Sequence, residues 1–178
     1  MEAPFVIERI SKLHNFKDFS CGEPSLDNYL RNWGVRNTQN DFSTTYVLCP
    51  RGTKEVIGYY SLCASSIRSC RLPEVKSAPR NIPTVLLGRI ALRHDFRGQG
   101  LGEILLIHVF RETLLVSTKI SVWGLELDAI NESVKQWYQN FGFMEIIDEP
   151  LHLYIEIETL RQLEADIWGE SIPDLRLT

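Results

Sequence analysis

Apolar and polar positions alternate with two periods along this chain, and the two periods predict different elements. Runs typical of strands occupy 6–10, 44–49, 56–64, 85–92, 120–128, 143–147 and 152–157. Helical spacing occupies 25–39, 102–116 and 131–140, and in the first of these it predicts that Trp33 packs in the core. Residues 68–83 contain three prolines and predict an irregular loop. This order of elements predicts one α/β domain with a mixed sheet.

The segment between strand 85–92 and helix 102–116 carries the clearest chemical signal. It reads Arg97-Gly98-Gln99-Gly100-Leu101-Gly102. Glycine permits positive φ and lets a ligand approach the backbone closely. The first amide groups of a helix have no partner within the helix, and the helix dipole adds partial positive charge there. The segment therefore predicts a binding turn for the pyrophosphate of a nucleotide-like cofactor.

Two familiar phosphate-binding loops do not fit this segment. A P-loop requires a Lys-Ser or Lys-Thr pair after its last glycine, and none follows here. A dinucleotide-binding fold requires the spacing G-x-G-x-x-G near the start of the fold, whereas the glycines here are spaced G-x-G-x-G after nearly a hundred residues. A third interpretation of the glycine segment rests on its resemblance to a known family.

Arg97-x-x-Gly100-x-Gly102 resembles the [RQ]-x-x-G-x-[GA] signature of the GNAT superfamily of acyl-CoA-dependent N-acetyltransferases. Three further segments resemble that family in order and spacing, across roughly residues 44–157: Leu87-Gly88-Arg89-Ile90-Ala91-Leu92, Leu125-Glu126-Leu127-Asp128-Ala129 with Asn131 after it, and Trp137-Tyr138-Gln139-Asn140-Phe141-Gly142-Phe143. The resemblance implies acetyl-CoA as co-substrate. It also implies a mixed, mostly antiparallel sheet that is flanked by helices and splayed between its central strands.

The N-terminal part of the chain narrows the resemblance to toxins of bacterial toxin–antitoxin pairs. The segments that carry it are Phe19-Ser20-Cys21-Gly22, Leu26-Asp27-Asn28-Tyr29-Leu30, Ile57-Gly58-Tyr59-Tyr60-Ser61-Leu62 and Leu86-Leu87-Gly88-Arg89-Ile90-Ala91. Members of that group acetylate the amino acid on charged tRNA, so aminoacyl-tRNA and a cognate antitoxin are the implied partners, together with a second copy in a homodimer. We assign residues 1–158 to the acetyltransferase domain and 159–178 to a C-terminal extension.

The resemblance also assigns roles to single residues. Tyr138 resembles the family's general acid, although its helical spacing alone favours a core aromatic. The candidate cofactor-binding residues are Ile90, Ala91, Leu92, Arg97, Gly98, Gln99, Gly100, Leu101, Gly102 and Asn131. Asn131 fits an N-cap as well as a bond to the pantetheine arm. Arg97 fits a pyrophosphate contact better than a free solvated side chain.

Charge along the chain is uneven. The net charge is −4, but residues 51–100 hold nine Lys/Arg against three Asp/Glu, whereas residues 145–178 hold two against nine. The basic middle contributes to a candidate set of RNA contacts, Arg31, Arg36, Arg68, Arg71, Lys76, Arg80, Arg89 and Arg93, from which we select Arg80, Arg89 and Arg93. The overall acidity is not typical of a nucleic-acid-binding domain, so RNA binding requires that these basic residues cluster in the fold.

Other features narrow the setting. The four cysteines are scattered without C-x-x-C or a Cys/His cluster, so we expect buried reduced thiols and no metal. No apolar run is long enough to cross a membrane, and the N-terminus lacks the features of a signal peptide, so we expect a cytoplasmic protein.

No histidine constellation suggests a general base. An α-amine with a pKa near 7.7–8.0 needs little help to lose its proton, and this favours aminoacyl-tRNA as the acceptor. Two rival functions stay open: the same chemistry on a small amine, peptide or protein N-terminus, and a domain that binds acyl-CoA or a partner without turnover.

Overall fold

The computed structural model describes residues 4–73, 75 and 77–168, and these divide into two compact units. Of the described residues, unit 1 contains 4–63 and 89–109, and unit 2 contains 64–73, 75, 77–88 and 110–168. Strands β3 (Gly58–Arg68) and β4 (Asn81–Leu92) and helix α3 (Leu101–Ser117) each contribute residues to both units. We describe each unit by itself.

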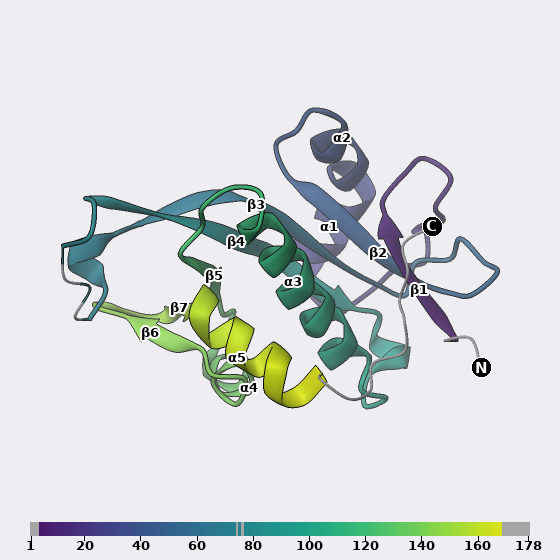
Figure 1. Cartoon of the computed structure of the whole chain (residues 1–178). Coiled ribbons are helices and arrows are strands. Elements are labelled where there is room, and N and C mark those ends of the chain that lie inside the picture. The colour runs from purple at the N-terminus through teal and green to yellow at the C-terminus, as the bar shows by residue number, and fades with distance from the viewer. Residues whose placement is uncertain (1–3, 74, 76, 169–178) are drawn as a thin grey trace. The chain divides into compact units, whose positions relative to one another are not determined.

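Unit 1 holds the N-terminal strands and helices. Its own elements are β1 (Phe5–Arg9), α1 (Pro24–Asn32), α2 (Gly34–Gln39), β2 (Thr44–Pro50) and a short 3₁₀ turn (His94–Phe96). Strand β1 pairs antiparallel with β2, and β2 with the start of β3, while α1 and α2 lie together next to β2 (Figure 1). Its core gathers Phe19, Tyr29, Leu30, Val47 and Tyr59.

The helix expected over 25–39 is two helices. The break falls at Trp33 and Gly34, where the Trp33 backbone is not helical (φ −123°, ψ −29°) and its N–H donates to the Tyr29 carbonyl. A Cβ on Gly34 would lie 3.2 Å from Ile10 Cδ1, so the glycine allows close packing on the end of β1. The break also overturns the prediction that Trp33 is a core residue, because its side chain is 43% exposed.

Unit 2 holds the rest of the sheet. Its own elements are a 3₁₀ turn (Ser69–Arg71), β5 (Gly124–Asp128), α4 (Glu132–Gln139), β6 (Met144–Ile146), β7 (Glu149–Glu156) and α5 (Ile157–Trp168). Strand β7 pairs antiparallel with both β5 and β6. The strand expected from residue 120 begins only at Gly124, and Ile120 is exposed.

The strands form one sheet in the order β1-β2-β3-β4-β5-β7-β6. Strands β4 and β5 are parallel over four residue pairs, from Thr84–Gly124 to Leu87–Leu127. Strand β4 continues five residues past Leu87, so its C-terminal part extends beyond this ladder. The α/β class with a mixed, mostly antiparallel sheet flanked by helices is confirmed.

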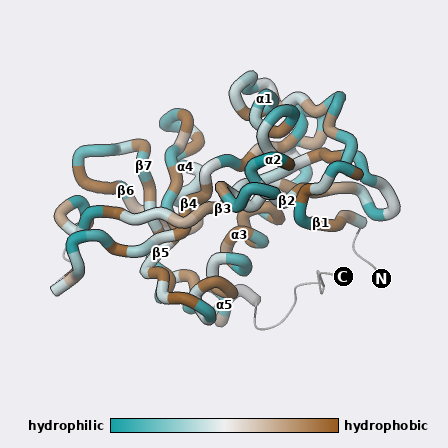
Figure 2. The backbone as a smooth tube through the Cα atoms, turned by 90° about the horizontal axis from the view of Figure 1, so that it is seen from above, coloured by the Kyte–Doolittle hydropathy of each residue, from teal (hydrophilic) through white to brown (hydrophobic). Residues whose placement is uncertain are grey.

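The segment after the last strand is partly helical. Helix α5 begins at Ile157, one residue before the boundary expected between the domain and its extension. Its sequence is amphipathic, and Figure 2 shows hydrophobic and hydrophilic positions alternating along it. Leu160 is fully buried, so this helix contributes to the core of unit 2. Residues 169–178 of the expected extension lie outside the described residues.

Candidate active site

The turn between β4 and α3 has the conformation that its glycines suggest. Gly98 and Gly100 have φ of +74° and +75°, in the left-handed region that side chains other than glycine rarely adopt. A Cβ built on either would meet no atom within 4 Å, so the space above the turn is open. The Ile104 amide donates to the Gly100 carbonyl at 3.2 Å, which begins the helical ladder. The amides of Leu101 and Gly102 precede it, at positions that have no hydrogen-bond partner within a helix and that favour an anion.

Arg97 has a partner that the sequence does not suggest. Its Nη2 donates to the backbone carbonyl of Cys21. A Cβ built on Gly22 (φ +88°) would lie 3.7 Å from Arg97 Nη2. The Arg97 side chain is exposed, so this bond leaves part of the guanidinium accessible. Its assignment to the pyrophosphate stays a prediction.

The carbonyls of the loop Phe19-Ser20-Cys21 accept hydrogen bonds from α1 and from the segment that leads into the glycine turn. Arg31 donates to the Phe19 carbonyl at 2.5 Å, and the His94 amide donates to the Ser20 carbonyl at 3.0 Å, with the His94 ring nitrogen Nδ1 at 2.9 Å from the same oxygen. The segment that carried the toxin resemblance therefore braces the predicted pyrophosphate turn within unit 1. Sequence reasoning gave these residues no such role.

The end of β4 presents the residues expected to pair with pantetheine. Ala91 is buried, whereas Ile90 and Leu92 are half-buried. A Cβ on Gly58 would lie 3.1 Å from Leu92 Cδ1 and 3.4 Å from the Ala91 carbonyl oxygen, so glycine lets β3 pass close to the end of β4 without crowding. Their role in cofactor binding stays a prediction.

Tyr138, in unit 2, lies near the end of α4 with its ring in the core. It is 3% exposed and makes edge contacts with Trp137 and Phe143. Burial raises the pKa of Tyr138, so the phenol holds its proton at neutral pH. Among the described residues, the Tyr138 hydroxyl has no hydrogen-bond partner. Every polar side-chain atom of those residues that is fully enclosed does have a partner, so the Tyr138 hydroxyl is not fully enclosed. The ring is thus a core aromatic, while the hydroxyl is in reach of solvent and free to donate.

Asn131 is the N-cap of α4. Its Oδ1 accepts a hydrogen bond from the Val134 amide at 2.9 Å, and its backbone is extended. This confirms the N-cap reading. The cap does not use the Asn131 side-chain amide, and the residue is exposed, so the predicted bond to pantetheine is compatible with it.

The three arginines selected as RNA contacts differ in their surroundings. The Arg93 guanidinium pairs with Glu55 and Asp95, so its charge is compensated. Arg89 lies with its guanidinium carbon 3.9 Å from the centroid of the Tyr29 ring, and among the described residues no carboxylate pairs with it. Arg80 is exposed and belongs to unit 2, whereas Arg89 and Arg93 belong to unit 1. Arg80 and Arg89 are therefore better candidates than Arg93. Lys76 lies outside the described residues.

A buried ionic cluster in unit 2 was not predicted from the sequence. Glu126 is 2% exposed and accepts hydrogen bonds from Thr84 Oγ1 and from His152 Nε2, the latter at 2.6 Å. Nδ1 of His152 lies 3.0 Å from Glu149, which pairs with Arg71. The available signal was an acidic residue inside the apolar strand 120–128.

Both members of the central pair favour their charged forms. Burial opposes ionisation of Glu126, but hydrogen bonds from His152, Thr84 and Ser65 outweigh it and lower the Glu126 pKa. The hydrogen bond to Glu126 raises the His152 pKa, against a smaller effect of burial. The charged pair therefore links β5 to β7.

Replacing His152 with Gln should destabilise the protein in a pH-dependent way. It leaves a buried carboxylate without its cation, at a cost of about 3 kcal/mol in the free energy of unfolding. The stability from His152 is complete below its ordinary pKa of 6.5 and is lost as pH rises through the raised value. The stability from Glu126 is complete above its ordinary pKa of 4.5 and is lost as pH falls through its lowered pKa. Urea unfolding across pH should show the largest loss of stability between the lowered Glu126 pKa and the raised His152 pKa. A pH-independent loss of stability would contradict a charged pair.

The fold and these local geometries define an acetyltransferase of the GNAT class. A family model described as an acetyltransferase (GNAT) domain matches residues 43–145, and the chain belongs to this family. Within it, the chain is 31% identical over 160 residues to a tRNA-acetylating toxin of Mycobacterium tuberculosis, covering 89% of this chain and 95% of that protein.

Two solved structures are similar along almost their whole length. The toxin AtaT complexed with acetyl-methionyl-tRNAfMet is 29% identical with a TM-score of 0.84, covering 89% of this chain and 98% of AtaT. A tyrosine-to-phenylalanine mutant of AtaT, bound to the C-terminus of the antitoxin AtaR and to acetyl-CoA, is 29% identical with a TM-score of 0.78, covering 91% and 99%. Among the described residues, no helix has both the length and the apolar character needed to cross a membrane.

Proposed function

We propose that this protein transfers the acetyl group of acetyl-CoA to the α-amine of the amino acid on charged tRNA, and that it acts as a toxin by blocking translation. The observation that carries the proposal is the similarity to a tRNA-acetylating toxin through 95% of that protein's length. The structural likeness to AtaT complexed with acetyl-methionyl-tRNAfMet supports the same acceptor.

The open turn at Gly98–Gly100 is our proposed pyrophosphate site. Two left-handed glycines, the first amides of α3, which have no partner within the helix, and the helix dipole together favour a doubly charged group there. Arg97 adds a positive charge at the edge of the turn. The likeness to an AtaT structure that contains acetyl-CoA supports this cofactor.

Tyr138 is our proposed general acid. The acceptor nitrogen attacks the thioester carbonyl carbon, the carbon–sulfur bond breaks, and the departing thiolate takes the Tyr138 proton. The acceptor nitrogen loses its own proton to solvent, leaving an amide and free coenzyme A. Because burial raises the Tyr138 pKa, the phenolate regains a proton from solvent before the next turnover.

Arg80 and Arg89, each within its own unit, are our proposed contacts with the tRNA backbone. Arg89 is held over Tyr29 without an acidic partner, and Arg80 is exposed, so both can approach phosphates at little cost. We further propose that the protein acts in the cytoplasm, where charged tRNA is found. A cognate antitoxin is the partner suggested by the AtaT complex with AtaR.

Replacing Arg80 with Ala should weaken binding to different tRNAs about equally and flatten the salt dependence of binding. Each lost phosphate contact removes roughly one unit from the slope of log affinity against log salt. The measurement is tRNA affinity and acetylation across a salt series. Arg161→Ala is the matched control, since Arg161 is exposed but already paired with Glu158. Salt-independent acetylation in both variants and the parent would exclude a tRNA acceptor and favour a small amine.

A further inference from the structure

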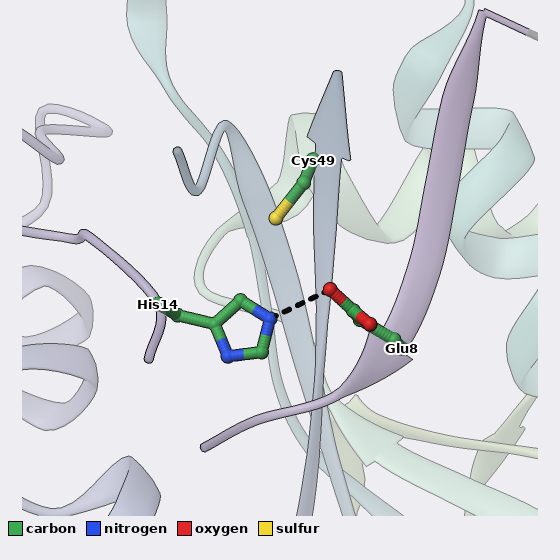
Figure 3. Close-up of side chains that lie close together, drawn as sticks. All are labelled: Glu8, His14 and Cys49. Atoms are coloured by element: carbon green, nitrogen blue, oxygen red, sulfur yellow. Dashed lines mark hydrogen bonds and ion pairs between the residues drawn. The ribbon is translucent and has the colours of Figure 1, made fainter. Parts of the chain in front are cut away.

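Three side chains with metal-binding atoms meet in unit 1. Glu8 lies on β1, His14 on the loop that follows β1, and Cys49 on β2 (Figure 3). A carboxylate oxygen, an imidazole nitrogen and the sulfur all lie within 4.8 Å of one another. His14 and Cys49 are 7% and 1% exposed.

The two strands bring these residues together through their register. Val6 pairs with Cys49 and Glu8 with Val47, so Glu8 and Cys49 are diagonal neighbours on adjacent strands. His14 approaches from the loop, and its Nε2 lies 2.9 Å from Glu8 Oε1. Cys49 is distant in the sequence from Glu8 and His14, and the three match no C-x-x-C or C-x-x-H spacing, so no metal site was predicted from the sequence.

We propose that Glu8, His14 and Cys49 form a binding site for Zn²⁺, with a water molecule as fourth ligand. Cysteine sulfur, histidine nitrogen and carboxylate oxygen are each zinc ligands in proteins, and three protein ligands with a water are a known zinc arrangement. Zinc bonds of about 2.0–2.3 Å place the ligand atoms of a tetrahedral site about 3.3–3.8 Å apart. The three atoms lie close enough to reach this arrangement by side-chain adjustment.

Groups around His14 suit a metal ligand. Zinc-binding histidines usually donate their second ring N–H to a backbone carbonyl or another acceptor. Nδ1 of His14 lies 3.1 Å from Ser11 Oγ and 3.3 Å from the Ser11 carbonyl. It also accepts from the Ser11 amide at 2.9 Å, which favours the tautomer that donates from Nε2 to Glu8 when no metal is bound. Metal binding at Nε2 therefore requires the ring proton on Nδ1, where the hydrogen bond from the Ser11 amide is lost and the Ser11 hydroxyl or carbonyl oxygen accepts instead.

Two further changes accompany metal binding. Burial raises the pKa of the Cys49 thiol to about 12, so the thiol is protonated without metal and its proton passes to solvent when Zn²⁺ binds. Lys54 pairs with Glu8 and competes with the cation for the carboxylate. Burial opposes ionisation of Glu8, but the hydrogen bonds from Lys54 and His14 lower its pKa, so it is an anion before the metal arrives.

The ordinary alternative is a polar cluster in which Glu8 pairs with Lys54 and accepts a hydrogen bond from His14, and which holds β1 to its neighbouring loop. Cys49 distinguishes the zinc site from this alternative. Its thiol contributes nothing to an ion pair, but its thiolate is the strongest zinc ligand of the three. A bound metal would connect β1, the following loop and β2, and would stabilise unit 1 in proportion to metal concentration.

The test uses the full chain, stripped with a chelator and then titrated with Zn²⁺ or Co²⁺. We expect one ion per chain, release of protons on binding, a higher melting temperature, and a thiolate-to-Co²⁺ charge-transfer band. Cys49→Ser should abolish the band and His14→Gln should weaken binding strongly. Cys70→Ser is the matched control because Cys70 is exposed and outside the cluster, and it should change nothing. No binding, or a band that survives Cys49→Ser in folded protein, would overturn the proposal.

Lys54→Met gives a second test with the opposite sign. Removing a cation beside Glu8 should tighten Zn²⁺ binding by about tenfold, because the repulsion between the ammonium and the metal is lost. The polar-cluster alternative instead predicts lower stability and no change in metal response. Both tests read metal binding rather than acetyl transfer, so their outcome is independent of the proposed function.

Discussion

Replacing Tyr138 with Phe is expected to lower kcat for acetyl transfer by roughly 10²–10⁴-fold while leaving acetyl-CoA affinity nearly unchanged. The ring contacts with Trp137 and Phe143 survive the change, and only the hydroxyl is lost. Since that hydroxyl has no partner among the described residues, its removal breaks no internal hydrogen bond. The loss should therefore be catalytic, with the melting temperature preserved.

The matched control is Tyr154→Phe. Tyr154 is also a buried tyrosine of unit 2 with a raised pKa, but it stacks on Trp123. Its change should leave kcat close to that of the parent. Single-turnover kinetics with saturating acetyl-CoA distinguishes the chemical step from product release. A folded Tyr138→Phe protein with near-normal turnover would remove Tyr138 from the mechanism.

Gly100→Val should weaken acetyl-CoA binding by roughly ten- to a hundredfold. A β-branched residue at φ +75° is strained by roughly 1–3 kcal/mol, so the turn must shift. Its side chain would also enter the open space where the pyrophosphate is expected. Calorimetry with acetyl-CoA gives the affinity directly.

Gly52→Val provides the control for this strain. Gly52 has φ +80° and equally open surroundings, but it lies in the turn after β2. Both variants should lose similar stability, while only Gly100→Val loses affinity. Equal affinities in the two folded variants would place the cofactor elsewhere.

Local rules accounted for much of the fold and the site. The turn at Gly98 and Gly100 was predictable because only glycine takes those φ values without strain, and the N-cap at Asn131 because its side chain needs only the amide three residues on. Strand and helix periods predicted most elements within a few residues of their ends. These features depend on short stretches of chain.

Features that depend on tertiary contacts were missed or misplaced. The helix break at Gly34 lies where the chain packs closely against Ile10, and Trp33 beside it is exposed. The bond from Arg97 to Cys21 joins residues 76 positions apart, and the Glu126–His152 pair joins residues 26 positions apart. No periodicity encodes such pairs, and the same holds for Glu8, His14 and Cys49.

The measurement that tests the central claim most directly is the fate of labelled acetyl groups. The protein is incubated with acetyl-labelled acetyl-CoA and a mixture of charged tRNAs, and the products are separated. We predict label on tRNA that is released by hydrolysis of the aminoacyl ester as an N-acetyl amino acid, and that is lost with Tyr138→Phe. Label confined to free amines or proteins, with none on charged tRNA, would contradict the account.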